Sequence, residues 1–411
     1  MHSLRPLIPI LVAAGILLGG NGLQGTLIAL RGAEEGFSAT IIGFLGTAYY
    51  AGFLLGCLAI VRIMRAVGHI RAFSTLAAIA ASATLVMAIA IDPTVWSASR
   101  FLSGFCFAGL FTVTESWLNS GVSNSSRAKV LSLYRVIDIG AVTGSQFIIP
   151  AVGVDGFAIF AVMAIMITLS LVPVSLGDRS NPSAPEGIKL DLRRAWNTSP
   201  LAALGCIVIG LTNSAFRTLS PVYAQDIGMS TADIATFVSV SIIGGAIIQY
   251  PLGHASDRYD RRTVLLYTTV LAFAAAFALA VFAGSDRLIN FVLVFVFGAF
   301  AMPLFSLSAA HANDRAAPNE YVPLNAALML FYSFGAIIGP FAAAAAMQRL
   351  GPHALFSFSA AVYVVFIALI LWRMRARPPA KEEERGRFIA LLRTSTIFAR
   401  LTDWRGENRK R

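Results

Sequence analysis

Five ionisable residues lie inside long apolar segments of this 411-residue chain, and their chemistry is the most informative feature of the sequence. They are Arg100, Glu115, Arg135, Asp138 and Arg217. A charge at the centre of a membrane-spanning helix costs about 2.5–3.5 kcal/mol on the insertion scale, so such residues usually face a cavity or pair with a partner. We therefore take these five as candidates for ligand, proton or ion-pair chemistry.

Asp138 and Arg135 are three residues apart, which places them one helical turn from each other and allows an ion pair. One interpretation is a structural pair that fixes the helix. The other is a carboxylate that holds a proton when its surroundings are dry and releases it when water or Arg135 is close. The second interpretation predicts proton coupling at Asp138, with Arg135 as its partner and Glu115 as a second, more cytoplasmic site.

Several polar residues near the centres of apolar segments are candidates to line a substrate cavity. Buried amides need hydrogen-bond partners, which a solute or a neighbouring helix can supply equally well. Arg100 and Arg217 have a second interpretation, since a long side chain can extend to the outer interface. Tyr332 has one too, because aromatic side chains commonly pack against helices or lipid. The cavity candidates are Asn21, Gln24, Arg100, Asn213, Arg217 and Tyr332.

The composition shows which elements must position these residues. Hydrophobic residues make up 57% of the chain and charged residues only 13%, against about 25% in soluble domains. Apolar runs of about 20 residues can cross about 30 Å of hydrocarbon, and they are continuous rather than alternating, which predicts helices. The predicted fold is all-α, with twelve spans at about 6–30, 38–61, 72–91, 95–119, 128–150, 156–177, 200–224, 231–253, 263–284, 288–310, 322–348 and 352–372.

The net charge of +11 is distributed as in a multi-pass inner-membrane protein rather than a nucleic-acid-binding one. With both termini in the cytoplasm, the cytoplasmic loops before the tail hold fourteen Lys and Arg residues, whereas the outer loops hold only Arg31, Arg287 and Arg349. The first apolar run lacks a small-residue cleavage site, so we expect a retained first span. The three cysteines lie in apolar runs and are expected to be core residues.

The chain is expected to consist of two six-helix bundles, residues 1–177 and 200–374. They flank a polar cytoplasmic linker, 178–199, and a basic tail follows at 375–411. The halves repeat at a shift of 192–195 residues, with Asn21 matching Asn213 and Gly104 matching Gly298. Gly140 and Gly144 match Gly335 and Gly339, and small residues at this spacing let helix backbones approach closely. The tail has the spacing of a basic amphipathic helix on anionic lipid, the alternative being a solvated, unstructured tail.

The loop after the eighth predicted span resembles the G-x-x-x-D-R-x-x-R-R signature of the major facilitator superfamily. The matching residues are Gly253, Asp257, Arg258, Arg261 and Arg262. The first-half loop departs from it, with Ile60 near the aspartate position. The strings at 68–73, 115–119 and 310–315 resemble the YcaD-like bacterial branch. The resemblance implies two pseudo-symmetric bundles, alternating access, ion coupling and a gating role for the signature loop. Residues 140–146 lack the G-P-x-x-G-G antiporter motif, which disfavours drug/proton antiport.

These observations predict a secondary active transporter that moves a small polar solute across the inner membrane, coupled to protons. Three intramembrane bases against two acids favour an anionic solute. Efflux of lipophilic compounds and a transporter-like sensor that moves no solute are the alternatives. The sequence has no metal-ligand spacing, nucleophile triad or phosphate-cradling loop, so we expect no enzyme activity, cofactor, metal or nucleic-acid partner. The expected partners are the solute, protons and membrane lipid, with the protein as a monomer.

Overall fold

The computed structural model describes residues 7–120, 127–176, 190–284, 286–317, 320–376 and 388. Over these residues the secondary structure is helical, with no strand. Twelve helical segments are long and apolar enough to cross a membrane, and each overlaps one predicted span. The all-α prediction with twelve spans is therefore confirmed.

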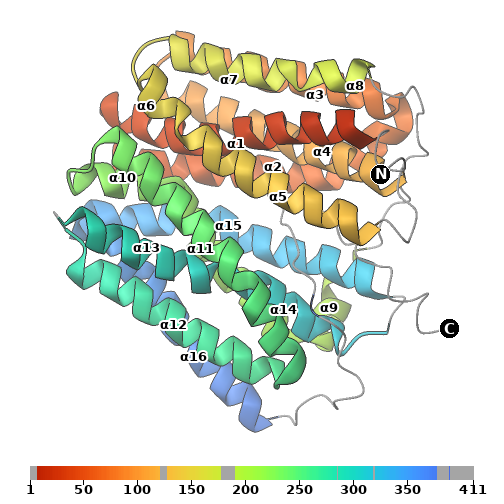
Figure 1. Cartoon of the computed structure of the whole chain (residues 1–411), viewed down its shortest axis with the longest axis vertical. Helices are drawn as coiled ribbons and strands as arrows, with labels where there is room; N and C mark the ends of the chain where they lie inside the picture. Colours follow the sequence, from red (N-terminus) through yellow and green to blue (C-terminus); the bar gives the residue numbers. More distant parts are fainter. Residues whose placement is uncertain are drawn as a thin grey trace. The chain divides into compact units, whose positions relative to one another are not determined.

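The first half of the chain forms α1 to α8, coloured red to yellow-green in Figure 1. Among these helices, α1 packs against α5 and α7, and α3 packs against α4 and α7. Their bounds are α1 Ile8–Glu34, α2 Ala39–Val67, α3 His69–Ile89, α4 Pro93–Ser120, α5 Arg127–Gln146, α6 Ile148–Val152, α7 Ala158–Leu169 and α8 Leu171–Leu176.

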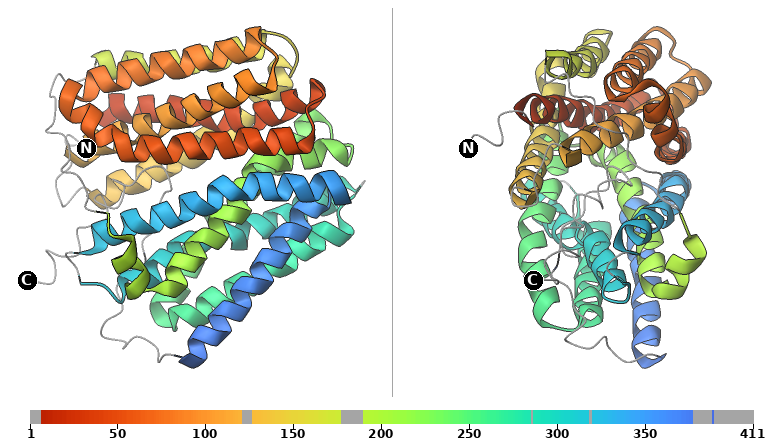
Figure 2. Two further views of the ribbon diagram at one scale, coloured as in Figure 1. Left: turned by 180° about the vertical axis from the view of Figure 1, so that it is seen from behind. Right: turned by 90° about the vertical axis from the view of Figure 1, so that its right-hand side faces the viewer.

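The second half forms α9 to α16. The most extensive pairings are α10 with α15, α11 with α13, and α12 with α16. These helices are coloured yellow-green to blue in Figures 1 and 2. The bounds are α9 Leu192–Thr198, α10 Pro200–Asp226, α11 Thr231–Arg258, α12 Arg261–Phe282, α13 Arg287–Ala301, α14 Leu304–Asn313, α15 Tyr321–Leu350 and α16 Ala354–Ala376.

Contacts between Cα atoms divide the chain into two units. Of the described residues, the first contains 7–37, 48–120 and 127–176, and the second contains 38–47, 190–284, 286–317, 320–376 and 388. The start of α2 thus groups with the second half, where the Thr47 hydroxyl donates a hydrogen bond to the Ile337 carbonyl at 2.6 Å.

Three predicted spans are each built from two helices, and a proline explains each break. Proline lacks the N–H that would bond four residues back, and its ring clashes with that carbonyl. Pro150 is four residues after Gln146, where α5 ends, and Pro173 is four residues after Leu169, where α7 ends. Pro303 lies between α13 and α14, two residues after Ala301 where α13 ends, and is the N-cap of α14.

Close helix contacts repeat between the halves at the predicted glycines. A Cβ atom on Gly104 would lie 2.0 Å from the Tyr49 carbonyl oxygen, and one on Gly298 would lie 2.0 Å from the Ser241 carbonyl oxygen. The α2–α4 and α11–α13 pairs therefore approach through equivalent positions, because only a hydrogen atom fits there.

The second pair of matched glycines, 140 and 144 against 335 and 339, makes close helix contacts in the second half only. Gly335 and Gly339 approach the α10 backbone, with a built Cβ 2.1 and 2.2 Å from carbonyl oxygens. Gly140 and Gly144 have no described atom within 4 Å of such a Cβ, so the predicted close approach is wrong at these two positions. In the first half, the close approach of α1 to α5 instead depends on Gly22 of α1, where an added Cβ would lie 2.8 Å from the Val142 side chain of α5.

The linker and tail lie mostly outside the described residues. Within the linker, α9 is a helix that the sequence analysis did not predict, and the Asp191 carboxylate caps it by accepting from the Arg194 N–H at 2.8 Å. The expected amphipathic tail helix lies outside the described residues, of which Phe388 is the only one beyond α16.

Candidate functional site

A connected set of polar side chains lies among α1, α2, α3 and α4, and we call it the α1–α4 polar cluster. It consists of Asn21, Gln24, Tyr49, Thr84 and Arg100. Arg100 Nη1 donates to Gln24 Oε1 at 2.8 Å, and Gln24 Nε2 donates to Thr84 Oγ1 at 3.1 Å. One hydrogen-bonded chain thus links helices α4, α1 and α3.

Tyr49 connects the cluster to α2. Its ring centre lies 4.3 Å from the Arg100 guanidinium carbon, which is cation–π geometry, and its hydroxyl donates to Asn21 Oδ1 at 2.6 Å. The Gly104 contact with the Tyr49 carbonyl explains why the two helices meet closely enough for this stacking. Three cluster members were predicted as cavity residues, and the structure brings Asn21, Gln24 and Arg100 together.

The cluster is nearly closed to its surroundings. Arg100 is 7% exposed and Gln24 is fully buried, whereas Asn21 is intermediate. Arg100 therefore does not extend to an outer interface. A buried guanidinium is a strong donor for carboxylate or phosphate oxygens, since charge-assisted hydrogen bonds gain strength where water is excluded. This arrangement suits recognition of a polar or anionic group at the Asn21 edge.

A second set of ionisable residues lies on α4 and α5. Arg135 Nη1 is 3.2 Å from Asp138 Oδ2, the pair that the three-residue spacing predicts. The Asp138 side chain is 17% exposed, and that of Arg135 is 31% exposed. Glu115 on α4 is fully buried and accepts a hydrogen bond from the Tyr134 hydroxyl at 3.3 Å. Glu115 is thus completely shielded from solvent, and Asp138 is shielded in large part.

The three cavity candidates of the second half differ in how far they are buried. Asn213 and Tyr332 are buried, and the Tyr332 ring contacts Phe305 edge to face at 5.6 Å between centroids. Arg217 is exposed. Tyr332 therefore fits the packing interpretation, and the exposure of Arg217 is compatible with a side chain that extends to an interface.

The signature loop joins α11 to α12 and is rich in ion pairs. Arg261 is buried and contacts Asp314 at 2.5 Å and Asp257 at 3.4 Å. Arg262 is also buried and pairs with Asp260 at 2.9 Å. Burial of Asp260 raises the pKa of its carboxyl group, but the hydrogen bonds and positive charge of Arg262 outweigh burial and hold that pKa below its usual range. Arg258 is exposed.

Phe388 contacts this loop from far along the chain. Its backbone N–H donates to Asp257 Oδ1 at 2.6 Å, and its ring covers Gly253, where an added Cβ would lie 2.3 Å from the ring. From the sequence we expect Asp257 to close the cytoplasmic side by meeting the start of α5, near Ser126, Arg127 and Lys129. Ser126 and the Arg127 side chain lie outside the described residues, so this contact stays a prediction.

Several residues of these sites were not among the candidates chosen from the sequence, and three of them show why. Thr84 gives no signal, because a threonine in a helix commonly bonds the carbonyl four residues back, as it does here with Ala80 at 2.9 Å. Tyr134 neighbours Arg135 and could have been found from that position. Phe388 belongs to the tail, for which the sequence predicted either a helix on lipid or a solvated segment and no contact with the signature loop.

The described residues contain no group of three or more His, Cys, Asp or Glu side chains that would hold a metal ion. Cys57, Cys106 and Cys206 are buried free thiols.

Comparison with known proteins gives consistent matches over nearly the whole chain. The sequence profile described as Major Facilitator Superfamily matches residues 10–321 and 202–405. An uncharacterized MFS-type transporter of Enterobacter sp. (strain 638) is 25% identical over 384 residues, covering 91% of this chain and 97% of the relative. The uncharacterized MFS-type transporter YcaD of Salmonella typhi is 24% identical over 383 residues, covering 91% and 97%.

Two solved structures share the fold. The nucleoside transporter NupG superposes with a TM-score of 0.75 at 12% identity, covering 90% of this chain and all of that one. A bacterial homolog of the human lysosomal transporter Spinster, in an inward-facing and occupied conformation, gives 0.76 at 13% identity, covering 92% and 97%. At these identities the likeness concerns the fold alone.

Proposed function

Because the chain belongs to the major facilitator superfamily, we propose that it is a secondary active transporter that moves a small polar or anionic solute by alternating access, coupled to protons. The family establishes a multi-pass membrane transporter. The solute class and the coupling ion are our proposal, and they rest on the side chains of the first unit.

The α1–α4 polar cluster is the observation that carries the proposal. A guanidinium that is 7% exposed is expensive in an apolar helix bundle unless it has partners, and Arg100 has an amide and an aromatic ring. A carboxylate or phosphate of a solute would add charge-assisted hydrogen bonds, which are about twice as strong as neutral ones. The accessible Asn21 would orient the solute at the cluster's edge.

A screen for ligand-induced stabilisation tests the solute class directly. A ligand that binds the folded protein raises its unfolding temperature by mass action. Purified protein is expected to be stabilised by members of an anionic or polar metabolite panel and not by lipophilic cations. Stabilisation by lipophilic cations alone would instead support drug efflux and contradict the proposal.

Proton coupling is proposed at Asp138, with Arg135 as its partner and Glu115 as the second site. A protonated Asp138 needs no counter-charge in a dry surrounding, whereas the ionised form is stabilised by Arg135 at 3.2 Å. Alternation between these states would link proton release to reorientation of the bundles.

The Asp138→Asn variant should lose accumulation driven by an imposed pH gradient while keeping part of its counterflow exchange. Uptake into proteoliposomes measures both activities with the solute found in the screen. Continued concentration of the solute by this variant would move the assignment to Glu115 or to another ion. Asp286→Asn, on an exposed helix cap, is the control and should retain both activities.

We also propose that the protein lies in the inner membrane with both termini and the 178–199 linker in the cytoplasm. The fourteen-to-three bias of basic residues between alternate loops supports this orientation. A reporter that is active only in the cytoplasm should be active when fused at Arg377, and a reporter that is active only in the periplasm should be inactive there. The opposite result would reverse the proposed topology.

A further inference from the structure

The short helix α9 presents exposed apolar and charged side chains beside the first residues of a membrane span. It packs against α10 and α15 of the second unit, and Figure 2 shows it as a short yellow-green helix near the start of α15. Trp196 keeps 40% of its surface exposed, and Leu190, which precedes the helix, keeps 38%. These residues lie outside the sites described above.

The connection to α10 fixes the depth of α9 in the membrane. α9 ends at Thr198 and α10 begins at Pro200, so little chain separates them. α10 contains 27 residues and is about 40 Å long at about 1.5 Å per residue, whereas the hydrocarbon core is about 30 Å thick. A span of this length extends beyond the hydrocarbon, which places its first turn and the adjoining α9 at the level of the lipid headgroups.

Two contacts with α15 orient α9 at this level. The Arg194 guanidinium forms an ion pair with Glu320, the N-cap residue of α15. The Trp196 ring lies 6.2 Å from the Phe331 ring between centroids, and Phe331 is about 16 Å along α15 from Glu320 at about 1.5 Å per residue. Trp196 thus lies nearer the hydrocarbon than the ion pair does, and tryptophan is enriched at this boundary because its ring is amphipathic.

Arg193 and Asn197 share the exposed face of α9 with Trp196. Residues three and four apart are neighbours on a helix, so Arg193 lies next to both Trp196 and Asn197. Arg193 and Asn197 are exposed, and they line an open surface hollow together with Asp191, Arg194 and Thr198. A guanidinium and an amide on one face supply the N–H donors that a phosphodiester accepts.

The charges around the hollow are close to balance. Arg194 is paired with Glu320, so the remaining charged groups of the lining are the Arg193 guanidinium and the Asp191 carboxylate. Asp191 Oδ1 accepts the Arg194 N–H at 2.8 Å, which holds this carboxylate beside the hollow. One positive and one negative group suit a headgroup that itself carries both charges better than a purely anionic one.

We propose that α9 binds the headgroup of a zwitterionic phospholipid through this surface. The phosphate contacts Arg193 and Asn197, and the cationic group contacts Asp191. The acyl chains lie beside Trp196. The occupant is a lipid rather than a free ion, because the surface joins a charged hollow to an exposed indole at the depth where a lipid joins its headgroup to its chains. The binding does not depend on which solute the protein moves.

Tryptophan fluorescence of the full-length protein in a neutral detergent tests the site. The signal of Trp196 is the difference between the unmodified protein and its Trp196→Phe variant. The probes are dioctanoyl phosphatidylcholine, which is zwitterionic, dioctanoyl phosphatidylglycerol, which is anionic, and dioctanoylglycerol, which has no charged headgroup. The Trp196 emission should shift saturably to shorter wavelength with phosphatidylcholine, at a lower half-maximal concentration than with phosphatidylglycerol. Dioctanoylglycerol should give no saturable shift.

The Arg193→Gln variant should raise the half-maximal concentration of phosphatidylcholine about tenfold, because a hydrogen bond between two charged groups is lost. Arg349→Gln is the matched control, since Arg349 is also an exposed arginine but lies in the last turn of α15, at the opposite end from Glu320. The proposal is overturned if the two variants respond alike, if phosphatidylglycerol binds more tightly than phosphatidylcholine, or if dioctanoylglycerol gives the same shift.

The depth of Trp196 is checked in proteoliposomes that contain brominated phosphatidylcholine. Bromine quenches tryptophan on contact, so bromines near the headgroup end of the acyl chains should quench Trp196 more than bromines near the chain ends. Trp96→Phe is the control, since Trp96 is fully buried and its removal should leave this difference unchanged. Equal quenching at both depths, or stronger quenching by aqueous iodide than by either lipid, would contradict the placement of α9 at the headgroups.

Discussion

The centres of the two halves differ in chemistry although their helices repeat. In the first half, Gln24 and Arg100 form the buried core of the α1–α4 polar cluster. The repeat shift of 192 residues takes Gln24 to Phe216, and the shift of 194 residues takes Arg100 to Val294. Both of these second-half residues are buried and apolar.

An aromatic group occupies this part of the second half. The rings of Phe216 and Phe297 lie 5.2 Å apart, and the Phe356 ring lies 5.4 Å from Phe297 and 4.8 Å from Tyr223. These contacts bury apolar surface and need no polar partner, so they suit a rigid scaffold. The comparison teaches that the matched contacts of Gly104 and Gly298 are retained, while the buried polar side chains at these positions of the first half are replaced by apolar ones in the second.

The largest expected effect that tests this asymmetry is on transport by an Arg100→Leu variant. The change removes a charge-assisted hydrogen bond and the cation–π contact with Tyr49, so solute transport should fall about 100-fold or more. Uptake into proteoliposomes measures it. Arg217→Leu, in the exposed position of the second half, should change uptake by less than about threefold. Equal losses in the two variants would show that both halves recognise the solute.

Alanine at the repeated glycines should instead affect both halves alike. Gly104→Ala and Gly298→Ala each place a Cβ atom 2.0 Å from a carbonyl oxygen, and such overpacking costs typically about 1–3 kcal/mol. Both unfolding temperatures should fall by similar amounts. Gly140→Ala, which meets open space in the described structure, should leave stability unchanged or raised. A fall in only one of the two glycine variants would argue against equivalent helix contacts.

The smallest expected effect separates two asparagines at matched positions. Asn21 accepts the Tyr49 hydroxyl at 2.6 Å on the accessible edge of the cluster, whereas Asn213 is buried. Asn21→Ala should weaken solute affinity about fivefold, the effect of roughly one hydrogen bond. Asn213→Ala should weaken it less than about twofold. Dose-dependent thermal shifts with the solute from the screen measure both, and the reverse order would refute the assignment of recognition to the first half.

Hydropathy predicted the twelve spans because the length and apolar character of a segment are properties of the sequence alone. The Arg135–Asp138 pair was predictable for a similar reason, since residues three apart on a helix are neighbours in any bundle. The contact of Gln24 with Arg100 was not predictable. Sequence position gives the depth of a residue in the membrane, but the rotation of each helix decides which residue it meets.

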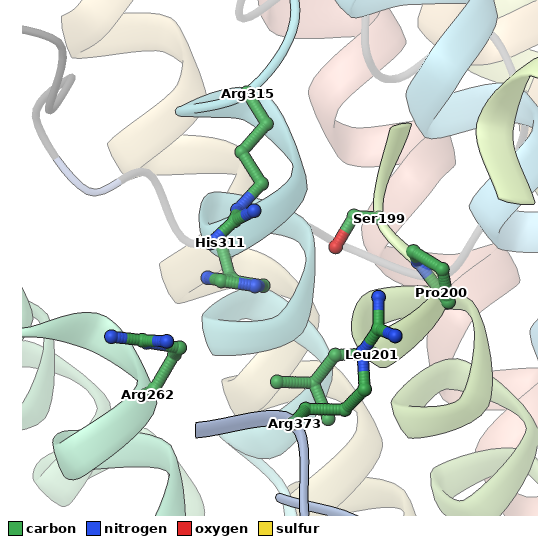
Figure 3. Close-up of a pocket in the computed structure, with 7 residues that line it drawn as sticks. All are labelled: Ser199, Pro200, Leu201, Arg262, His311, Arg315 and Arg373. Atoms are coloured by element: carbon green, nitrogen blue, oxygen red, sulfur yellow. The ribbon is translucent and has the colours of Figure 1, made fainter. Parts of the chain in front are cut away.

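A small pocket lined by Arg262, His311, Arg315 and Arg373 shows the same limit (Figure 3). These residues come from α12, α14, the loop after α14, and α16, and in the sequence each one alone is an ordinary basic residue near a helix end. The proline breaks were also missed, because a hydropathy pattern continues through a proline while the backbone hydrogen bonds do not.

The contact between Phe388 and Asp257 has a consequence for how the protein is made and handled. The carboxylate and its backbone donor are 131 residues apart, so the donor is synthesised only after every membrane helix is complete. A chain that ends with α16 would possess all twelve spans and still lack this partner for the signature loop. Shortened or tagged versions should therefore preserve the segment through residue 388 if the loop is to keep its native hydrogen bond.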